Sequence, residues 1–184
     1  FFFFYSMVSF CLKYGSRLNM RNIIEPVFHS IERLACTDQC GYIHYDNPVP
    51  VVAAAVQIGD RVVLVRSKTW PAGFFGFVAG FLEKSDATPE IGMRRELEEE
   101  IGVRESDILR MELLGATGHP RMNQVLIVFH CVVRPGTQVV MNEDELAEMK
   151  LVTLEDLRRE PVASRKSPFF PLLQKSGLIS NSKM

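Results

Sequence analysis

The sequence lacks a charge excess of either sign. Its 184 residues include 21 lysines and arginines against 22 aspartates and glutamates, a formal net charge of −1. The basic residues are scattered, with only a short cluster at Arg165 and Lys166, so the chain does not favour nucleic acid as its partner. The chain has no repeats or low-complexity segments, and 47% of its residues are hydrophobic. This composition predicts one soluble domain with a sizeable core plus tails. A ligand the size of a mononucleotide fits these limits.

A hydrophobic run long enough to cross a membrane is also missing. The apolar segment Phe1–Leu12 is shorter than the roughly 20 residues that a spanning helix needs. Residues 7–22 are basic, acid-free and partly amphipathic, which leaves two interpretations open: a mitochondrial or plastid transit peptide, or upstream sequence of a gene model with Met20 as the start. We therefore set residues 1–24 outside the fold as an N-terminal extension. Apart from the transit-peptide interpretation, we expect a cytoplasmic protein.

Cysteine is scarce, and its spacing does not suggest a disulfide-stapled fold. The four cysteines are Cys11, Cys36, Cys40 and Cys131. They show no framework spacing, which favours a reducing compartment.

One segment, GFLEKSDATPEIGMRRELEEEIGV from Gly80 to Val103, carries the chemistry. Thr88 is a favourable N-cap, Pro89 suits the first helical position and Gly102 is a natural stop, so we predict a helix from about Pro89 to Ile101. The apolar stripe of that helix, which should pack on a sheet, is Met93, Leu97 and Ile101.

Three glutamates share the adjoining face of this helix. Glu96, Glu99 and Glu100 stand at spacings i, i+3 and i+4, whereas Glu98 points to solvent. Carboxylates this close repel one another unless a hard cation lies among them, and oxygen ligands suit Mg²⁺ or Mn²⁺. The alternative interpretation is a solvated acidic helix face without a metal.

The spacing itself resembles a family signature. RELEEEIGV (residues 95–103), with Gly80 and an acid upstream, resembles the Nudix hydrolases, whose pattern is Gly, five residues, Glu, seven residues, then Arg-Glu-apolar-x-Glu-Glu-x-Gly-apolar. The chain departs from it in one loop: Asp86 replaces the upstream Glu, and eight residues separate it from Arg95. If the extra loop residue is instead counted before the acid, Ala87 occupies the position of the acid. The extra residue leaves the helical carboxylates in phase, so we expect weakened rather than abolished activity.

The resemblance extends over about residues 40–160, where the chain is similar to a Nudix subgroup that includes NADH-pyrophosphatase-like enzymes. It implies an α/β/α sandwich. The residues agree, because Val51–Ile58 and Arg61–Ser67 flank a Gly-Asp turn as a hairpin and Gln124–Val133 is a strong strand. Phe74–Phe81 is strand-like, and Leu154–Arg159 is helical. The fold class is therefore α+β with a mixed sheet. We expect a lead-in at residues 25–47, the Nudix domain at 48–165, and a C-terminal helix and tail at 166–184.

The resemblance also assigns roles. The implied metal ligands are Glu96, Glu99, Glu100, Glu145 and the carbonyl of Ala79. Glu99 is either a ligand or the base toward the attacking water, and Arg95 braces the helix against Asp86. Gly80, Asp86 and Gly102 are structural. The substrate candidates near the Gly118–Arg121 loop are His119, Arg121, Asn123 and Gln124. Glu145 could equally be a solvated loop acid, and His119 a solvated loop histidine. His130, in an apolar strand, should be a satisfied core or sheet-face histidine.

Members of the subgroup often carry a four-cysteine zinc ribbon before this domain. Here Cys36 and Cys40 remain of it, spaced by three residues, and His29 and His44 would have to complete a four-ligand set. We therefore expect a degenerate ribbon without zinc.

The predicted function is a Mg²⁺-dependent pyrophosphohydrolase, compatible with a homodimer, that cleaves a nucleoside diphosphate linked to another group: a nucleotide sugar, ADP-ribose or a dinucleotide cofactor. The Ser-Gln-Pro-Trp-Pro-Phe-Pro array of NADH-selective relatives is missing, so NADH is not singled out. Two alternatives stay open. One is a Nudix-fold protein that has lost catalysis and binds a nucleotide or an RNA 5′ end. The other is a hydrolase of capped or triphosphorylated RNA ends.

Overall fold

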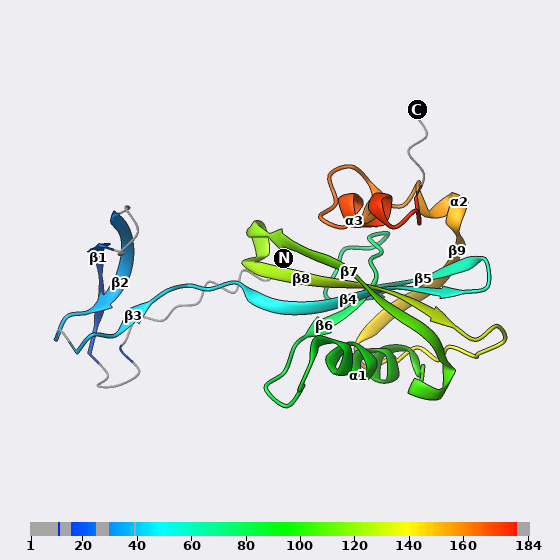
Figure 1. Cartoon of the computed structure of the whole chain (residues 1–184), viewed down its shortest axis with the longest axis horizontal. Coiled ribbons are helices and arrows are strands. Elements are labelled where there is room, and N and C mark those ends of the chain that lie inside the picture. Colours follow the sequence, from blue (N-terminus) through cyan, green and yellow to red (C-terminus); the bar gives the residue numbers. More distant parts are fainter. Residues whose placement is uncertain (1–10, 12–15, 25–29, 39, 180–184) are drawn as a thin grey trace. The chain divides into compact units, whose positions relative to one another are not determined.

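The computed structural model describes residues 11, 16–24, 30–38 and 40–179 (Figure 1). The chain divides into two compact units, and the boundary along the sequence lies between Asn47 and Pro48. The smaller unit holds β1 (Leu18–Ile24), β2 (Ser30–Cys36) and β3 (Ile43–His44) in an antiparallel sheet of order β1-β2-β3. β1 lies within residues 1–24, which the sequence analysis set apart as an N-terminal extension.

Three cysteines of the smaller unit lie together. The Sγ atoms of Cys11, Cys36 and Cys40 all lie within 4.8 Å of one another. His44, one of the two histidines considered from the sequence, is outside this cluster, and His29 lies outside the described residues. The absence of zinc from this unit stays a prediction.

A mixed six-stranded sheet forms the centre of the larger unit. Its order is β7-β8-β4-β5-β9, and β6 pairs with β4. The strands are β4 (Val49–Ile58), β5 (Arg61–Ser67), β6 (Val78–Phe81), β7 (Ile108–His119), β8 (Gln124–Val133) and β9 (Leu146–Thr153). β4 runs parallel to β8, and every other pairing in this sheet is antiparallel.

Helices cover both faces of this sheet (Figure 1). α1 (Pro89–Ile101) lies on one face, and α3 (Phe170–Lys175) lies on the other, with α2 (Leu154–Leu157) after β9. The 3₁₀ turns are η1 (Glu105–Asp107), η2 (Pro120–Met122) and η3 (Pro161–Ala163). Among the described residues no helix is long and apolar enough to cross a membrane. The α+β class with an α/β/α sandwich is confirmed.

The core has two halves because successive side chains of a strand point to opposite faces. Val52 and Val56 of β4 pack with Leu97 of α1, whereas Ala55 of β4 packs with Leu173 of α3. All five residues are fully buried. β4 is therefore apolar on both faces, and the apolar stripe of α1 packs on one face of the sheet.

Several element predictions are confirmed. The Gly59-Asp60 hairpin joins β4 to β5, β8 has the predicted bounds, and α2 begins the predicted C-terminal helical stretch. The strand predicted over Phe74–Phe81 is shorter, since the loop turns at Gly73 with φ of 79° and only Gly76 bridges to Val65 before β6 begins. β7 was not predicted. It is an edge strand whose register shifts twice, so its burial does not alternate cleanly.

Candidate active site

Local sequence signals place α1. The Thr88 hydroxyl accepts a hydrogen bond from the Ile91 amide at 3.3 Å, and Gly102 ends the helix in the left-handed region with φ of 68°. The Gly102 amide donates to the Glu98 carbonyl at 3.1 Å. The bounds of the helix are those predicted, and the predicted apolar stripe is fully buried.

Two of the three predicted carboxylates are buried between α1 and the sheet. Glu96 and Glu100 are each only 7% exposed, while Glu99 and Glu98 are exposed. Burial, followed by the charges of Glu96 and Glu145, raises the pKa of Glu100 to about 8. Burial also raises the pKa of Glu96, against a hydrogen bond from Arg95 that lowers it. Ionising both Glu96 and Glu100 in this site therefore costs free energy.

The chemistry of these donors suits a hard divalent cation. Among the described residues the buried Oε2 of Glu100 has no hydrogen-bond partner, although an unpaired buried oxygen is costly. Glu145 follows a turn in which its amide donates to the Asn142 carbonyl at 3.3 Å, and it is close enough to act on both Glu96 and Glu100. Several carboxylates with an unsatisfied oxygen are the ligands that Mg²⁺ or Mn²⁺ takes.

β6 supplies the other wall of the site. A Cβ on Gly80 would lie 2.0 Å from the Glu96 carboxyl carbon, so only glycine lets this carboxylate reach the strand. A hydrogen bond from the Ala79 backbone helps to hold the charged form of Glu100. The structural role predicted for Gly80 has this steric basis, while metal binding by the Ala79 carbonyl stays a prediction.

The departure from the family spacing leaves the Arg95–Asp86 pair intact. Arg95 Nη2 lies 3.0 Å from Asp86 Oδ2, and Arg95 Nε donates to Asp86 Oδ1 at 3.3 Å, a two-pronged contact. Asp86 Oδ2 also accepts from the Glu83 amide at 2.8 Å. These hydrogen bonds, that of Arg95 foremost, lower the pKa of Asp86. The shorter acid therefore reaches the arginine across the longer loop.

Arg95 links the loop to the carboxylates as well. Its Nη1 lies 2.7 Å from Glu96 Oε1 and 2.9 Å from Glu99 Oε2, and its Nη2 donates to the Phe81 carbonyl at 3.0 Å. One guanidinium thus joins β6, the loop and the acidic face of α1.

Gly92 is a residue that the sequence analysis missed. A Cβ there would lie 2.8 Å from Leu82 Cδ1 and 2.9 Å from Asp86 Oδ2. The glycine therefore gives the loop room to carry Asp86 against α1. A glycine inside a strongly specified helix is the signal that could have pointed to it, because it costs about 1 kcal/mol relative to alanine.

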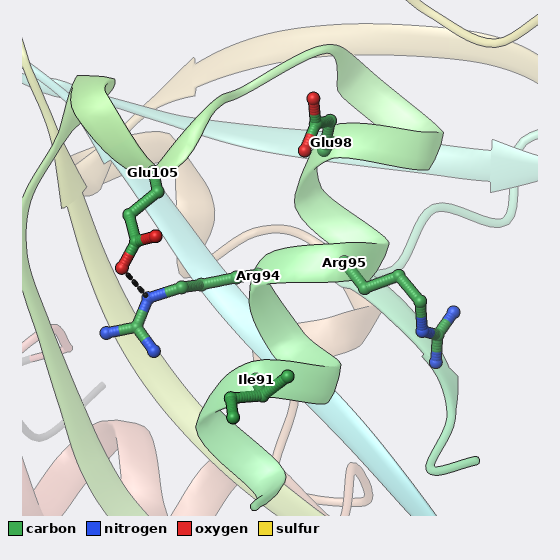
Figure 2. A pocket seen from close by; sticks show the side chains of 5 residues that line it. All are labelled: Ile91, Arg94, Arg95, Glu98 and Glu105. Atoms are coloured by element: carbon green, nitrogen blue, oxygen red, sulfur yellow. Dashed lines mark ion pairs between the residues drawn. The ribbon is translucent and has the colours of Figure 1, made fainter. Parts of the chain in front are cut away.

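A pocket lies between α1 and η1 (Figure 2). It is lined by Ile91, Arg94, Arg95, Glu98 and Glu105. Figure 2 shows Arg94 and Arg95 leaving the helix in opposite directions, and Arg94 Nε lies 3.3 Å from Glu105 Oε1. Arg95 lines this pocket, whereas Glu96, Glu99 and Glu100 do not. Glu98 also lines it and is exposed, as predicted.

The substrate candidates gather where β7 turns into β8. His119 is the last residue of β7 rather than a loop residue, and it pairs with Gln124. The Asn123 backbone is left-handed, with φ of 49°, and its carbonyl accepts from the Val49 amide at 2.8 Å. Arg121 lies in the turn itself. Among the described residues the buried Nδ1 of His119 has no hydrogen-bond partner. Substrate contact by this turn stays a prediction.

Known proteins share this fold and motif. The family model of the NUDIX domain matches residues 47–173, more than half of the chain. The chain belongs to the Nudix family. The predicted resemblance is thereby confirmed, and the helix that carries Glu96, Glu99 and Glu100 lies inside the matched region.

Relatives of this Nudix chain include longer proteins. It is 28% identical over 158 residues to the NAD-capped RNA hydrolase NudC of Pseudomonas aeruginosa, an alignment that covers 86% of this chain and 51% of that protein. The Mycobacterium tuberculosis protein of the same name is 30% identical over 119 residues, 64% of this chain and 37% of that protein. The chain thus spans about half or less of the length of these relatives.

Solved structures agree on the fold. A NUDIX hydrolase from Nitrosomonas europaea superposes with a TM-score of 0.61 at 25% identity, covering 79% of this chain and 77% of that one. The NUDIX domain of Shewanella oneidensis NrtR, solved with ADP ribose, gives a TM-score of 0.56 at 18% identity, with 71% of this chain and 86% of that one covered.

Proposed function

We propose that this chain is a divalent-cation-dependent pyrophosphohydrolase that cleaves a nucleoside diphosphate linked to a second moiety. The observation that carries the proposal is the acidic face of α1: Glu96 and Glu100 are buried and mutually repelling, and an oxygen of Glu100 has no donor among the described residues. A solvated acidic face would not bury two carboxylates against a strand. This arrangement therefore favours a cation site over the alternative interpretation.

Each site residue has a separate task. Glu96 and Glu100, with Glu145, hold the cation, which when bound neutralises the diphosphate charge and orients a water. Glu99, exposed at the edge of the site, accepts the proton of the attacking water or completes the ligand set. Arg95 keeps Glu96 and Glu99 in place through contacts of 2.7 and 2.9 Å, and Asp86 holds Arg95.

The test is a Mg²⁺-dependent screen with phosphate release as readout. The panel contains ADP-ribose, NADH, FAD, CoA, dinucleoside polyphosphates and nucleotide sugars. Glu96→Gln and Glu100→Gln should each lower turnover of the best substrate at least about 100-fold, because each removes a charged ligand. The matched control is Glu98→Gln on the same helix, which should be close to silent because Glu98 is exposed and lies off the carboxylate face.

Two outcomes would sink the proposal. Near-normal turnover in both ligand variants would remove the metal site. Tight binding of a nucleotide without turnover of any panel member would favour the Nudix-fold protein that binds but does not cleave.

NAD-capped RNA is a second candidate substrate, favoured by the name of the Pseudomonas and Mycobacterium relatives. A net charge of −1 argues against strong binding of the RNA body. Cleavage of NAD-capped RNA should therefore be compared with that of free NAD at two salt concentrations. Turnover of the capped RNA well above that of free NAD, and lost with salt, would establish the RNA end as the substrate.

A further inference from the structure

β7 leaves one edge of the large sheet without a strand neighbour. It is the first strand in the order β7-β8-β4-β5-β9, and among the described residues it pairs with β8 alone. Its register shifts between Ile108 and Arg110 and again between Leu113 and Gly115, so residues 110–113 form a regular stretch between two irregularities. The outer N–H and C=O groups of such a stretch can pair with another strand.

This edge exposes apolar side chains. Leu109 and Leu113 are each 54% exposed. Met111, between them, is partly buried and packs against the core that holds the apolar stripe of α1. An edge strand that carries exposed leucines favours association with a further strand.

The charged side chains of β7 are also left largely in solvent. Arg110 Nη1 lies 3.1 Å from Glu112 Oε2 on the same strand, and the two side chains are 59% and 54% exposed.

The opposite edge of the sheet, β9, differs in this respect. Glu148 of β9 lies 2.6 Å from Arg66 Nη2, and Lys150 Nζ lies 2.8 Å from Glu160. The charges of β9 are thus engaged by other elements of the chain, whereas those of β7 stay available to a partner.

The residue order at the centre of β7 is self-complementary. Residues 109–113 read Leu-Arg-Met-Glu-Leu. In an antiparallel pair of two copies with Met111 on the twofold axis, Arg110 of one copy lies opposite Glu112 of the other. Leu109 likewise lies opposite Leu113, and each contact occurs twice, as a twofold interface requires.

The charges select this register over its neighbours. Directly opposite side chains of antiparallel strands have Cβ atoms about 4.5–5.5 Å apart, which lets opposite charges attract and makes like charges repel. An axis moved to Arg110 would place the two copies of Arg110 opposite each other, and an axis at Glu112 would do the same with two glutamates. The axis at Met111 instead forms two ion pairs and two leucine pairs.

We propose that β7 is the interface of a homodimer, in which the β7 edges of two copies pair antiparallel about Met111 and join two sheets into one. Five residues from each copy make a small interface, which we expect to bury less than the roughly 1,200 Å² at the lower end of stable complexes. The dimer is therefore weak and depends on protein concentration. The pairing goes beyond the proposed function, because it uses none of the carboxylates of α1.

The test is sedimentation equilibrium of the full chain over an about 100-fold range of protein concentration. The wild-type chain should shift from monomer to dimer within this range. Glu112→Arg and Arg110→Glu should each raise the Kd of the dimer at least about tenfold, because each places like charges opposite each other. Arg61→Glu is the matched control: it makes the same charge change as Arg110→Glu at an exposed position of β5 and should keep the wild-type Kd.

Mixing the two charge variants separates lost pairing from lost folding. In an equal mixture, the two arginines of the Glu112→Arg chain lie opposite the two glutamates of the Arg110→Glu chain, so a one-to-one heterodimer should form although neither variant dimerises well alone. The double variant Arg110→Glu/Glu112→Arg reverses the order of the charges and should dimerise like the wild type.

Three results would each overturn the proposal: a wild-type chain that stays monomeric throughout the range, a dimer that both charge variants keep, or a mixture of the variants that stays monomeric. All three are read from molecular mass. They are therefore independent of whether the carboxylate site hydrolyses any substrate.

Discussion

Gly80 shows how one residue can decide a site. Its missing side chain leaves the volume that the Glu96 carboxylate occupies, and an added Cβ would lie 2.0 Å from the carboxyl carbon. Steric exclusion at this distance cannot be relieved by small shifts on the strand side, because β6 is paired with β4 through Val52. The acid has to move instead.

We therefore expect Gly80→Ala to lower turnover about 10- to 100-fold and to weaken Mg²⁺ dependence, since a displacement of about 1 Å at a site can cost that much. Turnover as a function of Mg²⁺ concentration measures both effects. Gly118→Ala is the stability control, because nothing lies within 4 Å of its added Cβ and its φ is not positive. An unchanged Mg²⁺ dependence in Gly80→Ala would contradict the steric argument.

His130 is a residue whose charge state affects stability. Burial lowers its pKa and the charge of Arg110 lowers it further, whereas Glu112 opposes both. The neutral ring lies with Nε2 2.8 Å from Oε1 of Gln57. This confirms the satisfied sheet histidine that the sequence predicts.

Because the pKa of His130 is lower in the folded protein than in the unfolded one, its contribution to stability is present above the unfolded pKa of 6.5 and is lost as the pH falls through the folded pKa. His130→Gln, which can keep a hydrogen bond to Gln57 but cannot titrate, should reduce the loss of unfolding free energy between about pH 7.5 and about pH 5.5. Denaturant unfolding at both pH values measures this. An equal loss in wild type and variant would show that His130 does not contribute.

At the scale of the elements, α1 and the loop before it act as one part. The helix is fixed by its cap and its apolar stripe, whereas the loop is fixed by Asp86, which accepts from Arg95 and from the Glu83 amide. The extra residue in the loop and the shorter acid compensate for each other. The altered spacing is therefore compatible with a complete site.

Asp86→Ala should lower turnover and destabilise α1 modestly. Arg95 loses the carboxylate that it contacts with two nitrogens, and it is then less well held beside Glu96. Deleting Ala87 together with Asp86→Glu restores the family spacing and should keep or raise turnover. Ser85→Ala, at an exposed position of the same loop, is the control. Turnover and thermal unfolding decide the matter: a silent Asp86→Ala, combined with a restored loop that abolishes turnover, would mean that other groups hold Arg95.

At the scale of the whole molecule, the proposed cation binding would be linked to folding of the larger unit. The folded state places Glu96 and Glu100 together at a cost, and this arrangement does not exist in the unfolded chain. A cation that binds only the folded state recovers part of this cost.

Mg²⁺ should therefore raise the unfolding temperature, with about 2.7 kcal/mol of added stability at free Mg²⁺ about 100 times Kd. Glu100→Gln should lose this response yet be at least as stable as wild type without the cation, because it removes a buried charge that Glu96 and Glu145 disfavour. Differential scanning calorimetry with and without Mg²⁺ tests both statements. Equal Mg²⁺ responses in the two proteins would place the cation elsewhere.

The sequence by itself determined the local features of this protein: the bounds of α1, its buried stripe, the hairpin between β4 and β5, and β8. Caps, turns and hydrophobic periodicity act over a few residues, so they can be recognised without the fold. The order of the carboxylates and the family spacing are equally local.

Only the tertiary structure decided which of these residues meet. Burial separates Glu100 from the exposed Glu99 one position earlier, Gly92 matters because Asp86 packs on it, and Cys11 lies beside Cys36 although 25 positions separate them in the chain. β7 was missed because an edge strand with two register shifts has no clean period. Each of these contacts joins residues whose separation along the chain says nothing about their distance in space, and long-range packing sets that distance.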